Sequence, residues 1–417
     1  MNLQLQKGKG KREKAIIEVT GSKSETNRLL LLQALYPNLN IENTSNSDDS
    51  EAMLRALQNS QLPTPNSQLV DVHHAGTAMR FLTAFFAIQE GKEVVLTGSS
   101  RMKERPIKIL VEALNQLGGE ITYEENEGFP PIRIKGKKLT ENKVSLPANV
   151  SSQYISALLL IAPKLENGLE LTLEGEITSI PYIRMTLSLL EEIGIETSFE
   201  NNTIKVTHHP SPIIQQLITI ESDWSSASYW YSLIALSEIG TQISLSRYKK
   251  NSLQGDSVLV DIYKNFGVET TFNEDNSITI FKTKNCQLSI VSYQLNNSPD
   301  IAQTIAVTCF GLGIGCDLVG LHTLKIKETD RLEALKIELS KLGAEISVTD
   351  ESLHLKPSTT ISENIAIKTY QDHRMAMAFA PLALQVPIKI NDAEVVSKSY
   401  PHFWNDLKRF GLTIKTV

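Results

Sequence analysis

The chain has only three cysteines, and their arrangement fits neither a disulfide framework nor a metal site. Cys286, Cys309 and Cys316 are an odd number and lack the paired spacing of metal ligands. Small proteins of oxidising compartments carry many paired cysteines. The sequence therefore indicates a protein of the reducing cytoplasm.

Long apolar runs and an excess of positive charge are also missing. The basic residues 7–14 are followed by only three apolar residues before Glu18, too few for a secretory signal, and no uninterrupted stretch approaches membrane-spanning length. The formal net charge of −6 provides no basic field for nucleic acid. We expect a soluble cytoplasmic protein with no membrane or nucleic-acid partner, whose anion sites are built from local cations.

Motifs for cofactors and covalent catalysis are absent as well. The sequence contains no phosphate-binding Gly-x-x-x-x-Gly-Lys-Ser/Thr loop and no dinucleotide fingerprint. His73 and His74 lack an acidic or thiol partner at a suitable spacing for a metal, and no cysteine or elbow serine stands near a basic cluster. We expect no metal and no organic cofactor.

What the chain does contain is a repeat within 417 residues, a length that suggests two domains. Five segments read as a helix that ends in glycine before a strand, and these glycines are 68 to 76 residues apart. They are Gly118, Gly194, Gly267, Gly343 and Gly411. The spacing is too long for ordinary solenoid repeats, so it predicts α/β units of roughly 70 residues.

A second series of polar helix starts alternates with these glycines. Its members are Ser24, Gly76, Ser151, Ser225, Asp300 and Asp372. The helices that follow are apolar nearly all round, which predicts burial inside a domain. The glycine-ended helices instead carry one apolar stripe, as in residues 332–342, where Glu338 falls outside the stripe. We predict six units, each with a buried and a surface helix, grouped as two domains of three.

The first polar cluster, Gly-Ser-Lys-Ser-Glu-Thr-Asn-Arg at residues 21–28, combines a glycine turn, hydroxyls and two cations at a helix start. Ser24 is the expected N-cap. Lys23 and Arg28 add charge to the exposed N–H groups of the helix, which favours a phosphate or carboxylate ligand. Capped helices that bind nothing are common, so this motif gains weight only from the clusters that follow.

Four further clusters precede predicted helices in the first half of the chain. Residues 75–80 offer Gly76 for close approach of a ligand and Arg80 one turn later. Residues 101–107 hold three cations, with Arg105 ahead of Pro106 at a predicted helix start; a solvated loop is an equal alternative. The neutral sets Ser151-Ser152-Gln153 and Ser179-Ile180-Pro181-Tyr182 suit hydroxyls or a phosphate, and capping is the simpler reading.

The second half supplies acidic residues beside cations. Asp300 opens a helix and is either a cap or, next to cations, a general base. Asp330 and Glu333 have capping-box spacing, which leaves Lys327, Glu328 and Arg331 to face a ligand. Asp372-His373-Arg374 and Lys398 complete the set. Together with the first half, these residues predict a site that binds small polyanions and moves protons.

These motifs, in this order, resemble the 3-phosphoshikimate 1-carboxyvinyltransferase (5-enolpyruvylshikimate-3-phosphate synthase) family of enolpyruvyl transferases. The matching segments are residues 21–24, 27–28, 75–80, 101–107, 151–153, 327–331 and 372–374. The resemblance implies an α/β fold of two domains, each with three βαβαββ-type repeats, buried helices inside and sheets outside (an inside-out α/β barrel). The implied domains are residues 21–221, and residues 1–20 with 222–417, with the active site in the cleft between them.

The implied reaction transfers the enolpyruvyl group of phosphoenolpyruvate to the 5-hydroxyl of shikimate 3-phosphate by addition and elimination, without a cofactor, in a monomer. Implied catalytic residues are Asp300, Glu328 and Lys23. Implied shikimate 3-phosphate contacts are Lys23, Ser24, Arg28, Ser151, Ser152, Gln153, Ser179, Tyr182, Asp300 and Lys327. Implied phosphoenolpyruvate contacts are Lys23, Gly76, Arg105, Gln153, Arg331, Arg374 and Lys398. Glyphosate, a phosphonate with a carboxylate, is an implied inhibitor, because Gly76 leaves room for a slightly longer ligand.

Two positions depart from the family pattern. His74 stands where the family usually has Asn, and Thr323 where a substrate-binding Asn is common. Two other functions therefore stay open. The first is the related UDP-N-acetylglucosamine carboxyvinyltransferase, which the lack of a cysteine in residues 101–107 disfavours. The second is a degenerate paralogue that binds phosphorylated metabolites without turnover, which Lys23, Asp300 and Glu328 disfavour.

Overall fold

The computed structural model describes residues 1–8, 16–60, 68–147, 151–175, 177, 179–209 and 216–417. Most of the basic stretch at residues 7–14 lies outside these ranges. The chain divides into two compact units, which we call the inserted unit, Gly21–Ile220, and the terminal unit, Met1–Thr20 with Glu221–Val417. Glu221 thus belongs to the terminal unit, whereas the sequence analysis placed it at the end of the first domain.

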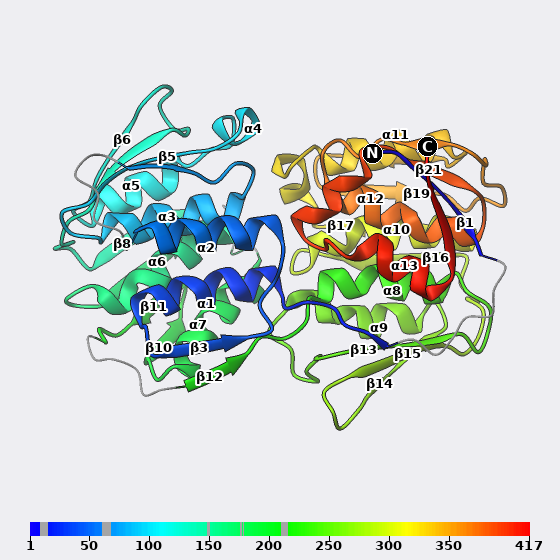
Figure 1. Cartoon of the computed structure of the whole chain (residues 1–417), viewed down its shortest axis with the longest axis horizontal. Helices are drawn as coiled ribbons and strands as arrows, with labels where there is room; N and C mark the ends of the chain where they lie inside the picture. The colour runs from blue at the N-terminus through cyan, green and yellow to red at the C-terminus, as the bar shows by residue number, and fades with distance from the viewer. Residues whose placement is uncertain (9–15, 61–67, 148–150, 176, 178, 210–215) are drawn as a thin grey trace. The chain divides into compact units, whose positions relative to one another are not determined.

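The inserted unit is built from α-helices and short strands in alternation (Figure 1). Its helices are α1 (Lys23–Leu35), α2 (Asp48–Ser60), α3 (Gly76–Ala87), α4 (Ser100–Lys103), α5 (Lys108–Gln116), α6 (Ser152–Ile161) and α7 (Ile180–Glu192). Its strands are β3 (Leu39–Glu42), β4 (Gln68–Asp71), β5 (Glu93–Thr97), β6 (Glu120–Tyr123), β7 (Ile132–Lys135), β8 (Lys143–Pro147), β9 (Leu169–Glu174), β10 (Thr197–Glu200), β11 (Thr203–Val206) and β12 (Gln216–Thr219).

The terminal unit repeats this alternation. Its helices are α8 (Trp224–Ala235), α9 (Leu259–Lys264), α10 (Ala302–Leu312), α11 (Arg331–Lys341), α12 (His373–Phe379) and α13 (Phe403–Phe410). Its strands are β1 (Leu3–Lys7), β2 (Ile16–Ile17), β13 (Gln242–Leu245), β14 (Val268–Phe272), β15 (Ile278–Lys282), β16 (Ile290–Gln294), β17 (Gly315–Val319), β18 (Ile346–Val348), β19 (Ser352–Leu355), β20 (Ala366–Ile367), β21 (Ile388–Ile390) and β22 (Leu412–Thr416). Short 3₁₀ turns η2 (Gly255–Val258), η3 (Pro299–Ile301), η4 (His322–Ile326) and η6 (Ala393–Lys398) join several of them.

One sheet plan recurs throughout. Among the described residues, five four-stranded sheets share the same order, in which a parallel pair of strands is followed by two strands that each run antiparallel to the strand before. They are β4-β5-β7-β6, β8-β9-β11-β10, β2-β13-β15-β14, β16-β17-β19-β18 and β20-β21-β1-β22. The sixth sheet pairs β12 with β3 in parallel. A parallel pair needs a crossover connection. In the pairs β4–β5, β8–β9, β16–β17 and β20–β21 this connection contains one buried helix, which is α3, α6, α10 and α12 respectively. Each unit therefore holds three repeats, which confirms the expected α/β class.

The core of each unit is a group of three helices. In the inserted unit α1, α3 and α6 pack together, and in the terminal unit α8, α10 and α12 do so. Within each unit these helices lie inward of the strands (Figure 1). Every residue from Ala302 to Phe310 of α10 is buried. A helix that is apolar all round can satisfy its burial only in such a position, so the predicted buried helices are confirmed.

The repeat glycines end the surface helices as predicted. Gly118, Gly194, Gly267, Gly343 and Gly411 all have φ between 76° and 113°. This left-handed conformation costs a residue with a Cβ more than it costs glycine. The five-fold glycine pattern is therefore a local backbone requirement and not a coincidence of composition.

Some helix starts lie away from the predicted residues. The N-cap of α1 is Ser22, whose hydroxyl accepts from the Glu25 amide, so Ser24 is already the second helical residue. Asp223, not Ser225, caps α8. Gly76 is the first residue of α3 after the N-cap Ala75, and α5 begins at Lys108 after the N-cap Ile107, two residues beyond Pro106. Among the described residues, no helix is long and apolar enough to cross a membrane.

The polarity of one surface helix was also predicted wrongly. Glu338 of α11, expected outside the apolar stripe, is fully buried. Its carboxylate accepts from Lys341 Nζ at 2.7 Å, from the Tyr370 hydroxyl at 2.6 Å and from the Lys368 amide at 3.1 Å. The buried charge is thus satisfied by groups that periodicity alone does not reveal.

Candidate active site

The centre of the polar cluster in the terminal unit is Arg331, the first residue of α11. Its guanidinium donates to three carboxylates, which are Asp372 Oδ2 at 2.7 Å, Asp300 Oδ1 at 2.8 Å and Glu328 Oε2 at 2.8 Å. The side chain is 2% exposed. Burial alone would lower the pKa of Arg331, but the three carboxylates raise it above its ordinary value. Arg331 was expected to face a ligand; in this structure its donors are directed at protein carboxylates.

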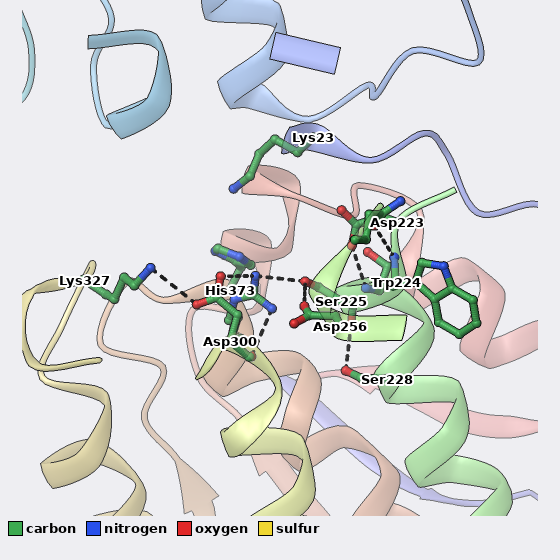
Figure 2. A network of polar contacts seen from close by, with 12 residues as sticks. Lys23, Asp223, Trp224, Ser225, Ser228, Asp256, Asp300, Lys327 and His373 are labelled. Carbon is green, nitrogen blue, oxygen red and sulfur yellow. Dashed lines mark hydrogen bonds and ion pairs between the residues drawn. The ribbon is translucent and has the colours of Figure 1, made fainter. Parts of the chain in front are cut away.

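Asp300 lies in η3, immediately before α10, and contacts two more cations. Its Oδ1 is 3.5 Å from Lys327 Nζ, and its Oδ2 accepts from Arg374 at 3.2 Å (Figure 2). Burial alone would raise the pKa of Asp300, but Arg374, Lys327 and Arg331 outweigh it and hold that pKa well below its usual range. Asp300 therefore does not act as a simple helix cap. It is an ionised carboxylate surrounded by positive charge.

Arg374 is placed by the start of α12. Asp372 caps this helix by accepting from the Arg374 amide at 2.8 Å, while its second oxygen accepts from Arg331. The Arg374 guanidinium also donates to the Asp300 carbonyl at 3.2 Å and to the Ser225 hydroxyl at 3.3 Å. Asp372 thus joins α11 to α12, a role that the sequence analysis did not assign.

Lys327 and Lys398 border this cluster. Burial lowers the pKa of Lys327 despite the opposing effect of Asp300, which brings its ammonium closer to a role in proton transfer. Lys398 is the last residue of η6 and donates to the Gln371 carbonyl at 2.7 Å, directly before Asp372. Thr323 of η4 has a buried hydroxyl with no hydrogen-bond partner among the described residues.

In the inserted unit, Lys23 opens α1 and faces the start of α2. Its Nζ is 3.5 Å from Asp49 Oδ2, and His74 Nε2 is 3.8 Å from Asp49 Oδ1 and from Asp48 Oδ2. The His74 and His73 rings also approach each other, with their Nδ1 atoms 2.6 Å apart. His74, one of the departures from the family pattern, therefore lies beside the acidic partner of Lys23. Asp49 was not identified from the sequence.

Arg28 is buried between α1, α6 and α7 rather than open to solvent. It donates to Thr186 Oγ1 at 2.8 Å, Ser156 Oγ at 2.9 Å and the Ser24 carbonyl at 2.8 Å. Its guanidinium carbon lies 6.0 Å from the centre of the Tyr182 ring. Burial lowers the pKa of Arg28 to about 10. This residue, expected to bind a ligand, makes internal contacts that hold three helices together.

Gly76 and Arg105 are in contact. A Cβ atom at Gly76 would lie 2.4 Å from one terminal nitrogen of Arg105, so the space expected for a ligand holds a guanidinium in this structure. Arg80 fixes the loop behind it, donating to the Gly76 carbonyl at 3.1 Å and to the Pro106 carbonyl at 3.0 Å. Burial, and then the charge of Arg105, lowers the pKa of Arg80 to about 10.

The neutral donors also gather at helix starts. Ser151 caps α6 by accepting from the Gln153 amide at 3.3 Å, and Ser152 is the first residue of that helix. The Gln153 side chain donates to Thr77 of α3 at 3.1 Å. Ser179 precedes α7 with φ of 56° and makes no side-chain cap. Its left-handed backbone, unusual for serine, orients the first turn that carries Tyr182.

The predicted site residues are divided between the two units. The terminal unit holds Asp300, Lys327, Glu328, Arg331, Arg374 and Lys398, of which Asp300 contacts Lys327, Arg331 and Arg374 directly. The inserted unit holds Lys23, Ser24, Arg28, Gly76, Arg105, Ser151, Ser152, Gln153, Ser179 and Tyr182, where direct contacts join Arg28 to Ser24 and Tyr182, and Gly76 to Arg105. The sequence analysis missed Asp256, which accepts a hydrogen bond from Ser225. Its only signal was an acidic residue after glycine in the turn Gln-Gly-Asp, which carries no specific prediction.

Comparisons with known proteins identify the family. A family model described as EPSP synthase (3-phosphoshikimate 1-carboxyvinyltransferase) matches residues 58–407. The 3-phosphoshikimate 1-carboxyvinyltransferase of Bacteroides fragilis (strain YCH46) is 44% identical over 406 residues, with 96% of each chain covered. The enzyme of that name from Haemophilus influenzae (strain ATCC 51907) is 35% identical over 424 residues, covering 95% of this chain and 96% of the relative.

Two solved structures share the fold. The EPSP synthase of Acinetobacter baumannii has a TM-score of 0.79 at 20% identity, with both chains fully covered. The enolpyruvyl transferase NikO of Streptomyces tendae has a TM-score of 0.74 at 14% identity, covering 99% of this chain and 98% of the other. From the family model and the relatives that match nearly the whole chain, this protein belongs to the EPSP synthase (3-phosphoshikimate 1-carboxyvinyltransferase) family.

Proposed function

We propose that this protein transfers the enolpyruvyl group of phosphoenolpyruvate to the 5-hydroxyl of shikimate 3-phosphate, releasing phosphate. The observation that carries the proposal is the environment of Asp300, an ionised carboxylate in contact with Lys327, Arg331 and Arg374. Such a cluster can accept a proton from a hydroxyl while its cations bind phosphate and carboxylate groups. Membership of the family supplies the identity of the two substrates.

The cations around Asp300 have a consequence for its strength as a base. A carboxylate whose pKa is held well below its usual range accepts a proton poorly. Anionic substrates that bind Lys327 and Arg374 would neutralise part of this positive field. The pKa of Asp300 would then rise, and the carboxylate would become a better base once the substrates are bound.

The proposed reaction has two steps. In the first step Asp300 takes the proton of the 5-hydroxyl, and the hydroxyl oxygen forms a bond to C2 of phosphoenolpyruvate. C3 gains a proton in the same step, which gives a tetrahedral intermediate. The bond from C2 to the phosphate oxygen then breaks, phosphate leaves with that bonding pair, and C3 loses a proton. We assign the proton exchange at C3 and at the departing oxygen to Glu328 and Lys23.

The remaining predicted contacts keep their proposed roles with two revisions. Ser24, Ser151, Ser152, Gln153, Ser179 and Tyr182 are assigned to shikimate 3-phosphate, and Gly76, Arg105, Gln153, Arg374 and Lys398 to phosphoenolpyruvate. Arg28 and Arg331 are buried and bonded to protein groups. We therefore assign them first to holding their clusters in shape, and a substrate contact would require them to release a protein partner.

We further propose that the protein acts as a monomer in the cytoplasm and is inhibited by glyphosate. Cys286, Cys309 and Cys316 are all free thiols, as suits a reducing compartment. Glyphosate carries a phosphonate and a carboxylate, so it suits the cations assigned to phosphoenolpyruvate.

The test is phosphate release by the purified protein with both substrates at saturation, followed by identification of the enolpyruvyl product. Replacing shikimate 3-phosphate by UDP-N-acetylglucosamine tests the related transferase. Calorimetric titration with shikimate 3-phosphate tests a protein that binds without turnover. We expect phosphate release with shikimate 3-phosphate alone as acceptor. Folded protein that binds this ligand but releases no phosphate above the blank would refute the enzymatic proposal.

A further inference from the structure

Asp256 is a buried acidic residue next to the site, with no role in the steps above. It lies in η2 and is 4% exposed. One oxygen, Oδ2, accepts a hydrogen bond from the Ser225 hydroxyl. The other, Oδ1, is buried without a hydrogen-bond partner among the described residues. A buried carboxylate oxygen left in this way costs free energy, so the position calls for an explanation beyond packing.

Hydrogen bonds of the neighbouring residue Gln254 hold Asp256 beside Ser225. Gln254, two residues earlier, accepts from the Trp224 amide at 2.9 Å and donates to the Ser222 carbonyl at 3.0 Å. These bonds tie η2 to the first turn of α8. Because Ser225 is the second residue of α8, its hydroxyl is held within reach of the Asp256 carboxylate (Figure 2).

Ser225 connects Asp256 to the cations of the site. Its hydroxyl hydrogen is directed to Asp256, which leaves the oxygen to accept from Arg374 at 3.3 Å. The same nitrogen of Arg374 donates to Asp300 Oδ2 at 3.2 Å. Asp256, Ser225, Arg374 and Asp300 therefore form one continuous chain of hydrogen bonds from η2 to η3.

We propose that Asp256 is a positioning residue that acts through Ser225 to direct Arg374 toward Asp300 and the anion that Arg374 binds. The inference rests on the proposed function, which assigns Arg374 to phosphoenolpyruvate. The Asp256 carboxyl group holds the serine hydroxyl in one orientation, and a fixed hydroxyl leaves its lone pair facing the arginine. Asp256 itself touches neither substrate nor reacting atoms.

The charge of Asp256 adds a second effect. It faces Asp300 from η3, Asp223 from the start of α8 and Arg374 from α12. Burial, and then the charge of Asp300, raises the pKa of Asp256 to about 7. When Asp256 ionises, its negative charge offsets part of the positive potential of Arg374. Binding of an anion to Arg374 should then weaken as the pH rises through neutrality.

The first experiment is a double-mutant cycle. Ser225→Ala, Asp256→Ala and the double variant are compared by the KM for phosphoenolpyruvate at pH 6. We expect each single variant to raise this KM by about 10-fold or more, as for loss of a hydrogen bond to a charged group, with a smaller effect on kcat. The double variant should be no worse than Ser225→Ala, because Asp256 acts through Ser225.

The matched control is Ser228→Ala. Ser228 is another fully buried serine of α8, and its hydroxyl contacts the Ser225 carbonyl and Thr304. Its loss should lower the melting temperature without raising the KM. If Asp256→Ala lowers stability but leaves the KM unchanged, or if the two single effects multiply in the double variant, the positioning role is refuted.

The second experiment uses Asp256→Asn, whose amide oxygen still accepts from Ser225 but carries no charge. The ratio of the wild-type KM to that of the variant is measured at each pH, which cancels the ionisation of the substrate itself. We expect a ratio near one at pH 5.5 that rises several-fold by pH 8.5. A ratio that stays constant over this range would show that Asp256 does not set the potential at Arg374.

Binding measurements keep this test independent of turnover. Calorimetric titration with phosphoenolpyruvate in the absence of shikimate 3-phosphate yields a Kd for wild type and each variant, because no acceptor is present for turnover. If wild type releases no phosphate, the proposed function fails. The Kd values would still test Asp256, because the same loss of affinity is expected. An unchanged Kd in Ser225→Ala and Asp256→Ala would overturn the inference in either case.

Discussion

Asp300 is the proposed general base and the carboxylate that contacts the cations of the site. It contacts three cations, and its substitution by Asn keeps the shape while removing the base. We expect Asp300→Asn to lower kcat at least about 100-fold, while binding of shikimate 3-phosphate survives in part. Asp261→Asn is the control, because Asp261 is an exposed partner of Lys264. Turnover near the wild-type level would leave Asp300 with a structural role only.

The raised pKa of Asp256 should also make the stability of the protein depend on pH. Its folded pKa of about 7 lies above the ordinary 3.8. Between these two values the folded protein holds a proton that the unfolded chain has released, so stability falls as the pH rises. Asp256→Asn has no such titration. Its melting temperature relative to wild type should rise from pH 4 to pH 7 and then level off. A difference in melting temperature between Asp256→Asn and wild type that stays constant from pH 4 to pH 7 would contradict the raised pKa of Asp256.

At Gly76 an added methyl group would contact the side chain of Arg105. The added Cβ would meet the terminal atoms of Arg105 at 2.4–2.9 Å, and a flexible side chain can yield at small cost. We expect Gly76→Ala to fold normally, to raise the KM for phosphoenolpyruvate and to weaken competitive inhibition by glyphosate, measured at fixed shikimate 3-phosphate.

The mechanism of that effect can be separated by a second substitution. If the methyl group acts by displacing Arg105, then Gly76→Ala should add little in an Arg105→Lys background. If it crowds the ligand directly, the two effects should multiply. A wild type that ignores millimolar glyphosate would instead contradict the predicted sensitivity.

At the scale of elements, Arg331 links the start of α11 to η3 and to the start of α12. Replacing it by Met would leave Asp300, Asp372 and Glu328 without a shared cation. Breaking a buried ion pair on one side costs about 3–5 kcal/mol, so we expect a loss of stability of that order in chemical denaturation. Arg101→Met is the control, since Arg101 forms an exposed pair with Glu104 and should change stability by less than about 0.5 kcal/mol. An equal loss of stability in Arg331→Met and Arg101→Met would show that the buried ion pairs of Arg331 stabilise the protein no more than an exposed pair does.

Elements with a local physical cause could be predicted from the sequence. The glycine-ended helices follow from a backbone conformation that glycine adopts most easily, and the buried helices follow from apolar residues on all sides. The caps of α1 and α8 were placed two residues late, because several hydroxyl and acidic residues compete for each cap. Backbone geometry decides among them, and it depends on contacts such as that between Gly21 and the Asn43 carbonyl.

The partners of buried charges could not be predicted in the same way. Arg28 bonds to Thr186, and Asp256 lies beside Asp300 only after η2 and η3 have packed near α8. These pairs are far apart in the sequence and follow no periodicity. A cation at a helix start therefore reads the same whether it faces a ligand or, like Arg331, three carboxylates of its own protein. The roles assigned to the individual site residues stay predictions.

At the scale of the whole molecule, the sheets of the two units differ in how the chain supplies them. The inserted unit is one continuous segment. The terminal unit takes β1 and β2 from the first residues, and β1 pairs on both sides, with β21 (Leu3 opposite Ile390) and with β22 (Leu3 opposite Thr416). β2 is an edge strand beside β13. The interior position of β1 means that β22 has no neighbour in this sheet without it.

This connectivity predicts different behaviour of two fragments. Residues 21–220 alone should show a cooperative thermal transition and retain helical circular dichroism. Residues 221–417 alone should lack such a transition, and a peptide of residues 1–20 added in trans should restore it. The matched control peptide carries Leu3→Lys and Leu5→Lys, which replaces two buried residues of β1. Cooperative folding of residues 221–417 without any peptide would contradict the prediction.

The same strand has a consequence for synthesis on the ribosome. At about 5–20 residues per second, the partners of Leu3 emerge roughly 20–80 s after Leu3 itself. During that time the whole inserted unit is made and can fold, while β1 still lacks the strands with which it pairs. β1 alternates Leu with Gln and ends in Lys, a pattern with little tendency to aggregate while unpaired. β1 would thus leave the ribosome well before its partner strands, and it would be fixed in place only after β21 and β22 have emerged.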